Sequence, residues 1–230
     1  MTRPLLLCDV ESALDAVQAY GAPILTRTGY ELLDDARLPE APLQSLRTTA
    51  VAAVTAERVA AEIADGAPAW SEVAIPQRWL TDPADPAVPV ALQTTAFRVL
   101  GCDAAMRAMH HALQPFVEEY ATGPVLPTVC YGPRVYRPGS VMLMHLDRYP
   151  THELGVSLIL DGPPWAMWMA DVSLARAGIA EETLSPRQHL IYEGCRLMHG
   201  RPTPNEQSVT AAFFHWHRLD ASTGSVARGD

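Results

Sequence analysis

The spacing of apolar residues changes at about Thr128, and this change constrains the fold of the chain more than any other feature. Ahead of it, apolar residues recur mainly at helical spacing, whereas after it they form short runs separated by Gly, Pro or Asp turns. The runs are VCYGPRVYRPG, SVMLMHLD, ELGVSLILDG, PWAMWMA, HLIYEG and SVTAAFFHWHR. Six or more short strands at such spacing indicate an antiparallel sandwich or barrel.

The residues ahead of this change predict helices, two short strands and a proline-rich loop. PLLLCDV and PILTRTGY are expected to be strands flanking a helix in ESALDAVQAYG, and LQSLRTTAVAAVTAERVAAEIADG predicts a longer helix ended by glycine. PQRWLTDPADPAVPV carries too many prolines for a regular element. DAAMRAMHHALQPFVEEYA predicts another long helix, with Asp103 as its N-cap and a break near Pro115.

At 230 residues the chain is long enough for one large domain or two small ones, and length alone does not choose between them. We expect a single domain over residues 1–220. Residues 1–125 are expected to form a helical and mixed buttress, and residues 126–220 a β-sandwich core. The fold class is therefore α+β. The last residues, 221–230, are expected to be a mobile tail.

Composition excludes several functions. The formal net charge is −9 and the 17 basic residues form no cluster, which argues against binding to nucleic acid. No apolar run is long enough to span a membrane and no signal peptide is visible, so we expect a cytoplasmic protein without a membrane partner. The four cysteines form no metal-binding pair and are expected to be buried thiols. The chain has no lysine, so any buried carboxylate must find arginine, histidine or hydroxyl groups.

Two metal-capable side chains, His145 and Asp147, lie one residue apart just ahead of a run that reads as a buried strand. Side chains alternate between faces along a strand, so both point the same way and can reach one metal ion. His199, in YEGCRLMHGRP, is the obvious third ligand. Two histidines and one carboxylate on one face leave coordination positions open, as in non-haem iron(II) oxygenases.

The run from Tyr131 to His217 resembles the 2-oxoglutarate and iron(II) dependent dioxygenases, in particular their prolyl-4-hydroxylase-like branch. YGPRVYRPGSVMLMHLDRYPTH and LIYEGCRLMHGRP are similar to small microbial members of that branch, as is the aromatic strand FFHWH at the end. The resemblance covers a little over a third of the chain. It implies a double-stranded β-helix, that is, a jelly-roll or cupin-like core.

The resemblance also implies a set of ligands. His145, Asp147 and His199 would hold Fe(II), and 2-oxoglutarate would chelate the metal before O2 reacts. The basic residue that the family places about ten positions after the distal histidine is missing here, because residues 207–211 read QSVTA. Arg201 is the preferred partner for the distal carboxylate of 2-oxoglutarate, since it lies two residues beyond His199 and its planar fork suits a carboxylate. Arg134 is the alternative.

Further residues have two interpretations each. Tyr136 matches a family tyrosine that can bind the cosubstrate, but core packing explains it equally well. His152 either contacts cosubstrate or substrate, or lies at the rim. Arg148 and Tyr149 either hold a substrate carboxylate at the cavity mouth or cap the strand. Tyr131 and Trp168 are further candidates for lining the substrate pocket, and for Trp168 a place in the core or wall is the simpler reading.

The resemblance implies an oxidoreductase that oxidises an unactivated C–H bond by hydroxylation, or diverts to desaturation or ring closure. Retention of Asp147 disfavours halogenation. The expected substrate is a small molecule, either a free amino acid or derivative or an intermediate of natural-product biosynthesis, and a homodimer is possible. A peptide or protein prolyl hydroxylase is the first alternative. A non-oxidative cupin-like metalloenzyme and a non-catalytic ligand-binding sandwich are the others.

Overall fold

A computed structural model describes residues 28–63, 81–82, 85–89, 96–145, 147, 151–171, 178–197, 199–201 and 203–219. Its elements in chain order are β1 (Tyr30–Asp34), η2 (Asp35–Arg37), α2 (Glu40–Thr55), β2 (Val59–Ile63), β3 (Thr81–Asp82), β4 (Asp85–Pro89), β5 (Ala96–Val99), α3 (Asp103–Ala121), β6 (Val125–Tyr136), β7 (Met142–His145), β8 (Leu154–Asp161), β9 (Trp165–Asp171), β10 (Gly178–Leu184), β11 (Gln188–Tyr192), β12 (His199–Arg201) and β13 (Val209–Arg218). The predicted helix in ESALDAVQAYG and the strand in PLLLCDV lie outside the described residues.

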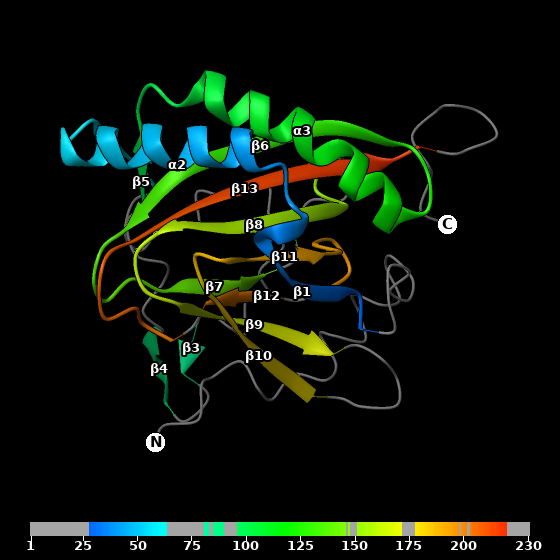
Figure 1. The fold of residues 1–230 in the computed structure, drawn as a ribbon. Helices are drawn as coiled ribbons and strands as arrows, with labels where there is room; N and C mark the ends of the chain where they lie inside the picture. Colours follow the sequence, from blue (N-terminus) through cyan, green and yellow to red (C-terminus); the bar gives the residue numbers. More distant parts are fainter. Residues whose placement is uncertain are drawn as a thin grey trace.

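Two antiparallel sheets form the body of the molecule (Figure 1). The larger sheet has seven strands in the order β1-β11-β8-β13-β6-β5-β2, and the smaller has four in the order β10-β9-β12-β7. Each of the six predicted runs contains one of these strands, namely β6, β7, β8, β9, β11 and β13. The sandwich prediction is therefore confirmed. The chain's first described strand, β1, and the later β2 and β5 join the same large sheet.

Both faces of the large sheet are buried, which explains the nearly continuous apolar sequence of β8 and β13. Alternate residues of these strands serve different cores. Leu158 and Phe214 belong to the core that also contains apolar residues of α2 and α3. Ile159 and Phe213 belong to the core between the sheets, together with Met167 of β9. The interior between the sheets is the part of the fold that holds the candidate site.

Helices α2 and α3 lie side by side over the large sheet (Figure 1). The buried residues of α3 recur at helical spacing; they are Met106, Met109, His110, Leu113, Phe116 and Val117. The predicted range of this helix is confirmed, but two details are wrong. Cys102 occupies the N-cap position instead of Asp103, and the helix continues through Pro115 to a left-handed Thr122.

The alanine-rich segment after α2 corrects a second prediction. The helix ends at Thr55, and residues 59–63 form strand β2 and not a further part of the helix. Glu57 has a left-handed backbone at φ 54°, which turns the chain, and Val59 then pairs with Val99 of β5. Pairing with the sheet thus outweighs the helix propensity of alanine.

The proline-rich segment also differs from its prediction, because β3 and β4 form a two-stranded antiparallel ladder there. Prolines are tolerated at strand edges, where no backbone N–H is required, so the segment can pair despite its composition.

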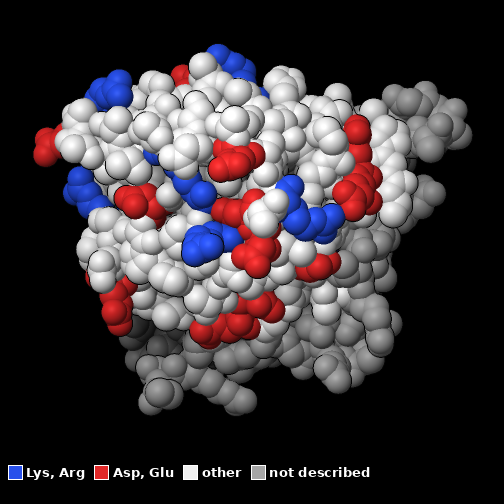
Figure 2. Space-filling view, in the orientation of Figure 1, with Lys and Arg blue, Asp and Glu red and all other residues white. Residues whose placement is uncertain are grey.

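Acidic and basic side chains are interspersed over the face of the molecule in Figure 2. Several of them form ion pairs, for example Arg37 with Glu119 and Arg98 with Asp103. None of the helices within the described ranges is long and apolar enough to cross a membrane.

Candidate metal centre

Strands β7 and β12 bring two of the predicted metal ligands opposite each other. The Cα atoms of His145 and His199 are direct partners in this antiparallel ladder. On its other edge, β12 pairs with β9, where His199 faces Met169. The side chain of His145 lies outside the described atoms, and the described side chains alone contain no cluster of three His, Cys, Asp or Glu groups placed to hold a metal ion.

The third predicted ligand, Asp147, lies beside His199. Its Oδ2 is 3.5 Å from His199 Nε2, and both side chains are buried. His199 Nδ1 is 2.8 Å from the carbonyl oxygen of Leu197, which can only accept, so Nδ1 carries a proton. In the neutral ring Nε2 then presents a lone pair to a carboxylate oxygen. Two acceptors so close repel unless a cation or a proton lies between them, so this pair suits a divalent metal ion.

A turn at residues 193–197, immediately after β11, touches both of these side chains. The backbone N–H of Asp147 donates to the carbonyl of Gly194 at 2.9 Å. A Cβ atom at Gly194 would lie 2.2 Å from Asp147 Oδ2, so only glycine leaves room for the carboxylate. Leu197 of the same turn orients His199, as described above. We call residues 193–197 the ligand turn.

Arg201, two residues beyond His199, is fully buried between the sheets. Its Nη1 donates to the carbonyl of Trp165 at 2.5 Å, and its guanidinium lies 4.8 Å from the centre of a Trp165 ring. Its Nε and Nη2 atoms have no hydrogen-bond partner in the described structure. Burial lowers the pKa of Arg201 to about 10. The group remains a cation at neutral pH with two N–H groups available to an anion.

Two buried tyrosines flank this region. Tyr136 packs on Trp165 with ring centres 5.1 Å apart, and Tyr192 packs on His199 at 4.7 Å. Burial, followed by the charge of Asp147, raises the pKa of Tyr192 well above its usual value, so its hydroxyl stays protonated. Tyr192 was not among the predicted site residues. The sequence points to Tyr192 only through its position directly ahead of residues 193–197.

Tyr131, His152 and His215 form an aromatic cluster, which we call the histidine–tyrosine cluster. Tyr131 stacks on His152 with ring centres 5.4 Å apart, and His152 lies 4.2 Å from His215. Burial, followed by the neighbouring His152, lowers the pKa of His215 well below its usual value, so this ring is neutral. Its Nδ1 has no hydrogen-bond partner among the described atoms. The cluster therefore combines buried and half-buried aromatic rings with the neutral imidazole of His215.

The remaining predicted site residues are distributed as follows. Arg134 is half-buried and its guanidinium covers the ring of Tyr131 at 4.9 Å. Trp168 is buried in β9, where its backbone pairs with Gly200. Arg148 and Tyr149 lie outside the described residues.

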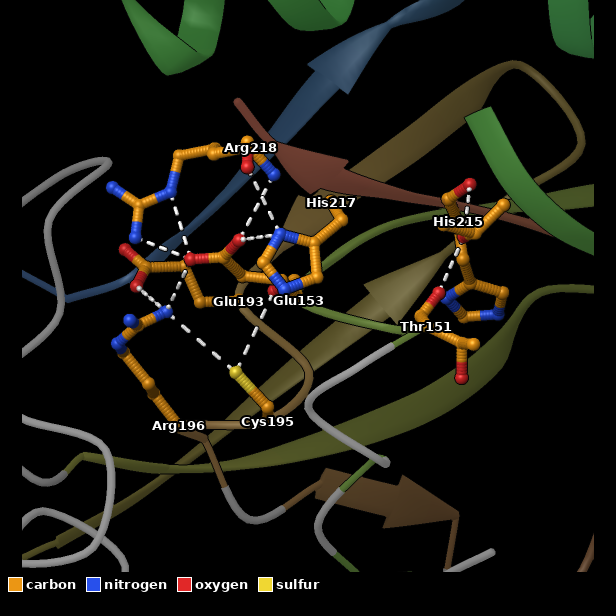
Figure 3. Close-up of polar contacts among 9 residues, drawn as sticks. Thr151, Glu153, Glu193, Cys195, Arg196, His215, His217 and Arg218 are labelled. Carbon is orange, nitrogen blue, oxygen red and sulfur yellow. Dashed lines mark hydrogen bonds and ion pairs between the residues drawn. The ribbon is translucent and has the colours of Figure 1, made fainter. Parts of the chain in front are cut away.

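A buried ionic cluster surrounds Glu153, and the sequence did not predict it (Figure 3). Glu153 Oε1 accepts from Arg196 Nη1 at 3.1 Å and from Arg218 Nε at 2.8 Å, with a further contact to Arg218 Nη2. Its Oε2 lies 3.0 Å from His217 Nδ1. Arg196 also approaches Glu193 Oε2 at 3.5 Å. We call these five residues the Glu153 cluster.

The charges of the Glu153 cluster stabilise each other. Burial alone would raise the pKa of Glu153, but hydrogen bonds from His217 and Arg218 outweigh it and lower the pKa to about 2. Burial would likewise lower the pKa of His217, but its bond to Glu153 raises it. Cys195 lies beside the cluster, and burial raises the pKa of its thiol to about 12. The cluster is therefore a paired ionic assembly next to a protonated thiol.

Comparisons with known proteins identify the fold. No protein-family model matches the chain, and no curated protein matches its sequence. Similar solved structures include an oxidoreductase of the 2OG-Fe(II) oxygenase family from Burkholderia pseudomallei, at 10% identity and a TM-score of 0.53 over 90% of each chain. A Pseudomonas putida prolyl-4-hydroxylase is 14% identical, with a TM-score of 0.51 over 91% of this chain and 99% of its own.

A third similar structure is HygX from Streptomyces hygroscopicus, solved with nickel, 2-oxoglutarate and hygromycin B bound. It is 10% identical, with a TM-score of 0.51 over 90% of this chain and 86% of its own. At such identities the likeness identifies the fold. The chain has the fold of the 2-oxoglutarate and iron(II) oxygenases, with their jelly-roll core, as the resemblance predicted.

Proposed function

We propose that this protein is an Fe(II) and 2-oxoglutarate dependent dioxygenase whose metal ligands are His145, Asp147 and His199. The observation that carries the proposal is the close approach of Asp147 Oδ2 to the lone pair of His199 Nε2, on a strand paired with that of His145. Paired positions in an antiparallel ladder lie on one face of the sheet, which favours His145 as the third ligand. The shared fold supports the same chemistry.

Bound Fe(II), with 2-oxoglutarate and O2, supplies the oxidation of an unactivated C–H bond while 2-oxoglutarate becomes succinate and carbon dioxide. The chain's own residues bind, orient and shield these groups. Leu197 fixes the tautomer of His199, and Gly194 leaves space for the carboxylate of Asp147. Buried aromatic rings, among them Tyr192, exclude water from the metal side.

Arg201 is the proposed partner of the distal carboxylate of 2-oxoglutarate. It is fully buried, and two of its nitrogen atoms have no hydrogen-bond acceptor among the described residues. A guanidinium in such surroundings gains most from a carboxylate, because two parallel hydrogen bonds then offset its desolvation. Arg134 is half-buried and already covers Tyr131, so it suits the role less well. Tyr136, buried near Arg201, is proposed to donate its hydroxyl to the cosubstrate.

For the substrate we propose a free amino acid or a small natural-product intermediate. The histidine–tyrosine cluster supports this choice, because it offers aromatic rings for stacking and the Nδ1 atom of His215, which has no hydrogen-bond partner among the described atoms. HygX binds hygromycin B within the same fold, which illustrates that the fold accepts compact polar ligands. The prolyl-4-hydroxylase neighbour favours a peptide substrate as the second candidate.

The test begins under anaerobic conditions. Fe(II) and 2-oxoglutarate are added to the purified protein, and the visible charge-transfer band of the chelated metal is expected for the wild type and not for Asp147→Ala. Glu206→Gln is the matched control, because this acidic side chain is exposed and is not one of the residues of the candidate site. Absence of the band from the wild type would contradict the proposal and favour a sandwich that only binds a ligand.

Oxygen is then admitted with panels of amino acids, natural-product intermediates and prolyl peptides, and succinate is followed. Succinate formation coupled to oxidation of a small molecule is the expected result. Turnover with peptides only would replace the proposed substrate class by the peptidyl one. Metal binding without consumption of 2-oxoglutarate or O2 would point to a non-oxidative cupin-like enzyme.

A further inference from the structure

The Glu153 cluster and the candidate metal centre are joined by the ligand turn, residues 193–197. On one side, the turn contributes Glu193 and Arg196 to the cluster. On its other side, Gly194 and Leu197 bond to Asp147 and His199. A rigid turn therefore transmits the position of the cluster directly to two metal ligands.

The turn has a defined internal structure. The backbone N–H groups of Arg196 and Leu197 both donate to the carbonyl of Glu193 at 3.0 Å. The N–H of Glu193 donates to Gly29, which ties the start of the turn to the segment ahead of β1. These bonds fix the shape of the turn, but none of them holds it against the sheets on the side of Glu153.

Arg196 supplies the ionic attachment on that side, next to a weak contact at 4.0 Å from Cys195 Sγ to the carbonyl oxygen of Glu153. Its side chain is almost completely buried and reaches from the turn to Glu153, which directly precedes β8 of the large sheet. Figure 3 shows the two guanidinium groups of Arg196 and Arg218 meeting at the carboxylate of Glu153. Buried ion pairs of this kind contribute less to net stability than to fixing one arrangement among several.

We propose that Arg196, anchored by Glu153, is a positioning residue that sets the affinity of the metal centre through the ligand turn. This inference rests on the proposed function, because it takes Asp147 and His199 as ligands. Arg196 itself touches neither metal nor cosubstrate in this scheme. Its removal leaves the carboxylates of Glu153 and Glu193 close together without the cation between them, and their repulsion displaces the turn.

Metal binding without turnover tests the proposal. Co(II) is titrated into the metal-free protein, and heat and the visible d–d spectrum are recorded. Arg196→Gln is expected to weaken Co(II) binding ~10- to 100-fold, the usual cost of losing a residue that supports metal ligands. Arg196→Lys, which keeps the charge but not the planar fork, is expected to restore part of the affinity.

Arg218→Gln is the matched control. Arg218 bonds to the same carboxylate through two of its nitrogen atoms, yet it lies on β13 and not on the ligand turn. We expect it to reduce thermal stability about as much as Arg196→Gln does, while Co(II) affinity stays within about threefold. Equal losses of metal affinity in both variants would overturn the proposal, since they would reflect a general loss of stability.

Gly194→Ala tests the same turn where Arg196 variants do not fold. Its added Cβ overlaps Asp147 Oδ2, so Co(II) affinity is expected to fall while the Glu153 cluster remains intact. Unchanged affinity in Gly194→Ala or in folded Arg196→Gln would refute the positioning role.

The Asp147→Ala variant separates this inference from the proposed function. If wild type binds no Co(II), or Asp147→Ala binds it as well as wild type, the metal centre itself is wrong. If those two proteins behave as expected and the variants of the turn do not, only the role of Arg196 is wrong.

Discussion

Two buried arginines on neighbouring segments, Arg196 and Arg201, have opposite surroundings. Arg196 lies between the carboxylates of Glu153 and Glu193. Arg201 is buried at least as deeply but has only a carbonyl and an aromatic face as described partners. Burial by itself would lower the pKa of both guanidinium groups. For Arg196 the negative neighbours outweigh burial, so its pKa is raised. For Arg201 burial dominates, and its pKa falls to about 10.

The difference distinguishes a buried charge that the fold itself neutralises from one that we propose to bind a ligand. Removing a guanidinium from water costs several kcal/mol unless good hydrogen bonds replace the water. The fold supplies those bonds to Arg196 from its own carboxylates. For Arg201, the described residues supply no acceptor to two of its nitrogen atoms, and a dicarboxylate ligand would satisfy both. Five predictions test this contrast.

The largest expected effect is on stability and concerns Glu153, the carboxylate that pairs with Arg196. Glu153→Gln is expected to lower the free energy of unfolding at pH 7 by about 3 to 5 kcal/mol, because it leaves buried cations without their counter-charge. Urea denaturation followed by circular dichroism measures it. Glu119→Gln, which disrupts an exposed ion pair with Arg37, should cost less than about 1 kcal/mol. Similar small losses in both variants would contradict the structural role of Glu153.

The stabilisation by Glu153 should depend on pH. Its folded-state pKa, about 2, lies below its ordinary value of 4.5, so the ionised form is favoured by folding. The contribution is fully present above pH 4.5 and is lost as the pH falls toward 2. We expect the stability difference between wild type and Glu153→Gln to shrink by about 3 kcal/mol over that range. A difference that does not vary between pH 3 and pH 7 would be incompatible with this shift.

The contribution of His217 to stability should depend on pH in the opposite direction to that of Glu153. Its pKa is raised in the folded state, so its contribution is present below its ordinary value of 6.5 and is lost as the pH rises through the folded value. In Glu153→Gln this upward shift should disappear, which a histidine titration by NMR measures.

For Arg201, which has no carboxylate partner among the described residues, the expected loss is in ligand affinity. Arg201→Met should weaken 2-oxoglutarate binding to the Ni(II)-loaded protein by about 2 to 3 kcal/mol, or roughly 30- to 160-fold in Kd. Without ligand its stability should stay the same or rise, because an apolar group replaces a poorly paired charge. Calorimetry measures both. Arg134→Met is the control, and a larger loss of affinity there than in Arg201→Met would reverse the assignment.

The smallest effect is expected at Tyr136. Tyr136→Phe removes one neutral hydroxyl and should cost about 1 kcal/mol, or roughly fivefold in the Kd of 2-oxoglutarate. Tyr120→Phe provides the comparison, because that hydroxyl bonds to Glu31 outside the candidate site. An unchanged Kd in Tyr136→Phe would favour plain core packing for this tyrosine.

Local patterns predicted the C-terminal strands and helix α3, because the strands contain short apolar runs bounded by turn residues and the helix contains an apolar repeat of period 3.6. They failed where pairing between distant segments decides the structure. The VAAEI segment of β2 has helical composition and becomes a strand only beside β5. The strand β10 was missed for a similar reason, since its GIAEETL sequence is mostly polar and pairs with β9.

In the candidate site, too, some residues could be predicted from local sequence and others could not. The proposed ligands His145, Asp147 and His199 are readable because two of them lie one residue apart at the end of β7 and the third follows within a recognisable motif. The Glu153 cluster is not readable, because Arg196 and Arg218 come from distant parts of the chain. The absence of lysine did predict what a buried carboxylate must use, and Glu153 uses two arginines and a histidine.

The pairing of β7 with β12 has a thermodynamic consequence for the arriving ion. Hydrogen bonds of the ladder hold the backbones of His145 and His199 side by side. The loss of chain entropy on closing that long loop therefore belongs to folding and not to coordination. A metal ion bound as proposed would find two of its donors on strands that are already aligned, so little further ordering of the chain would oppose its binding.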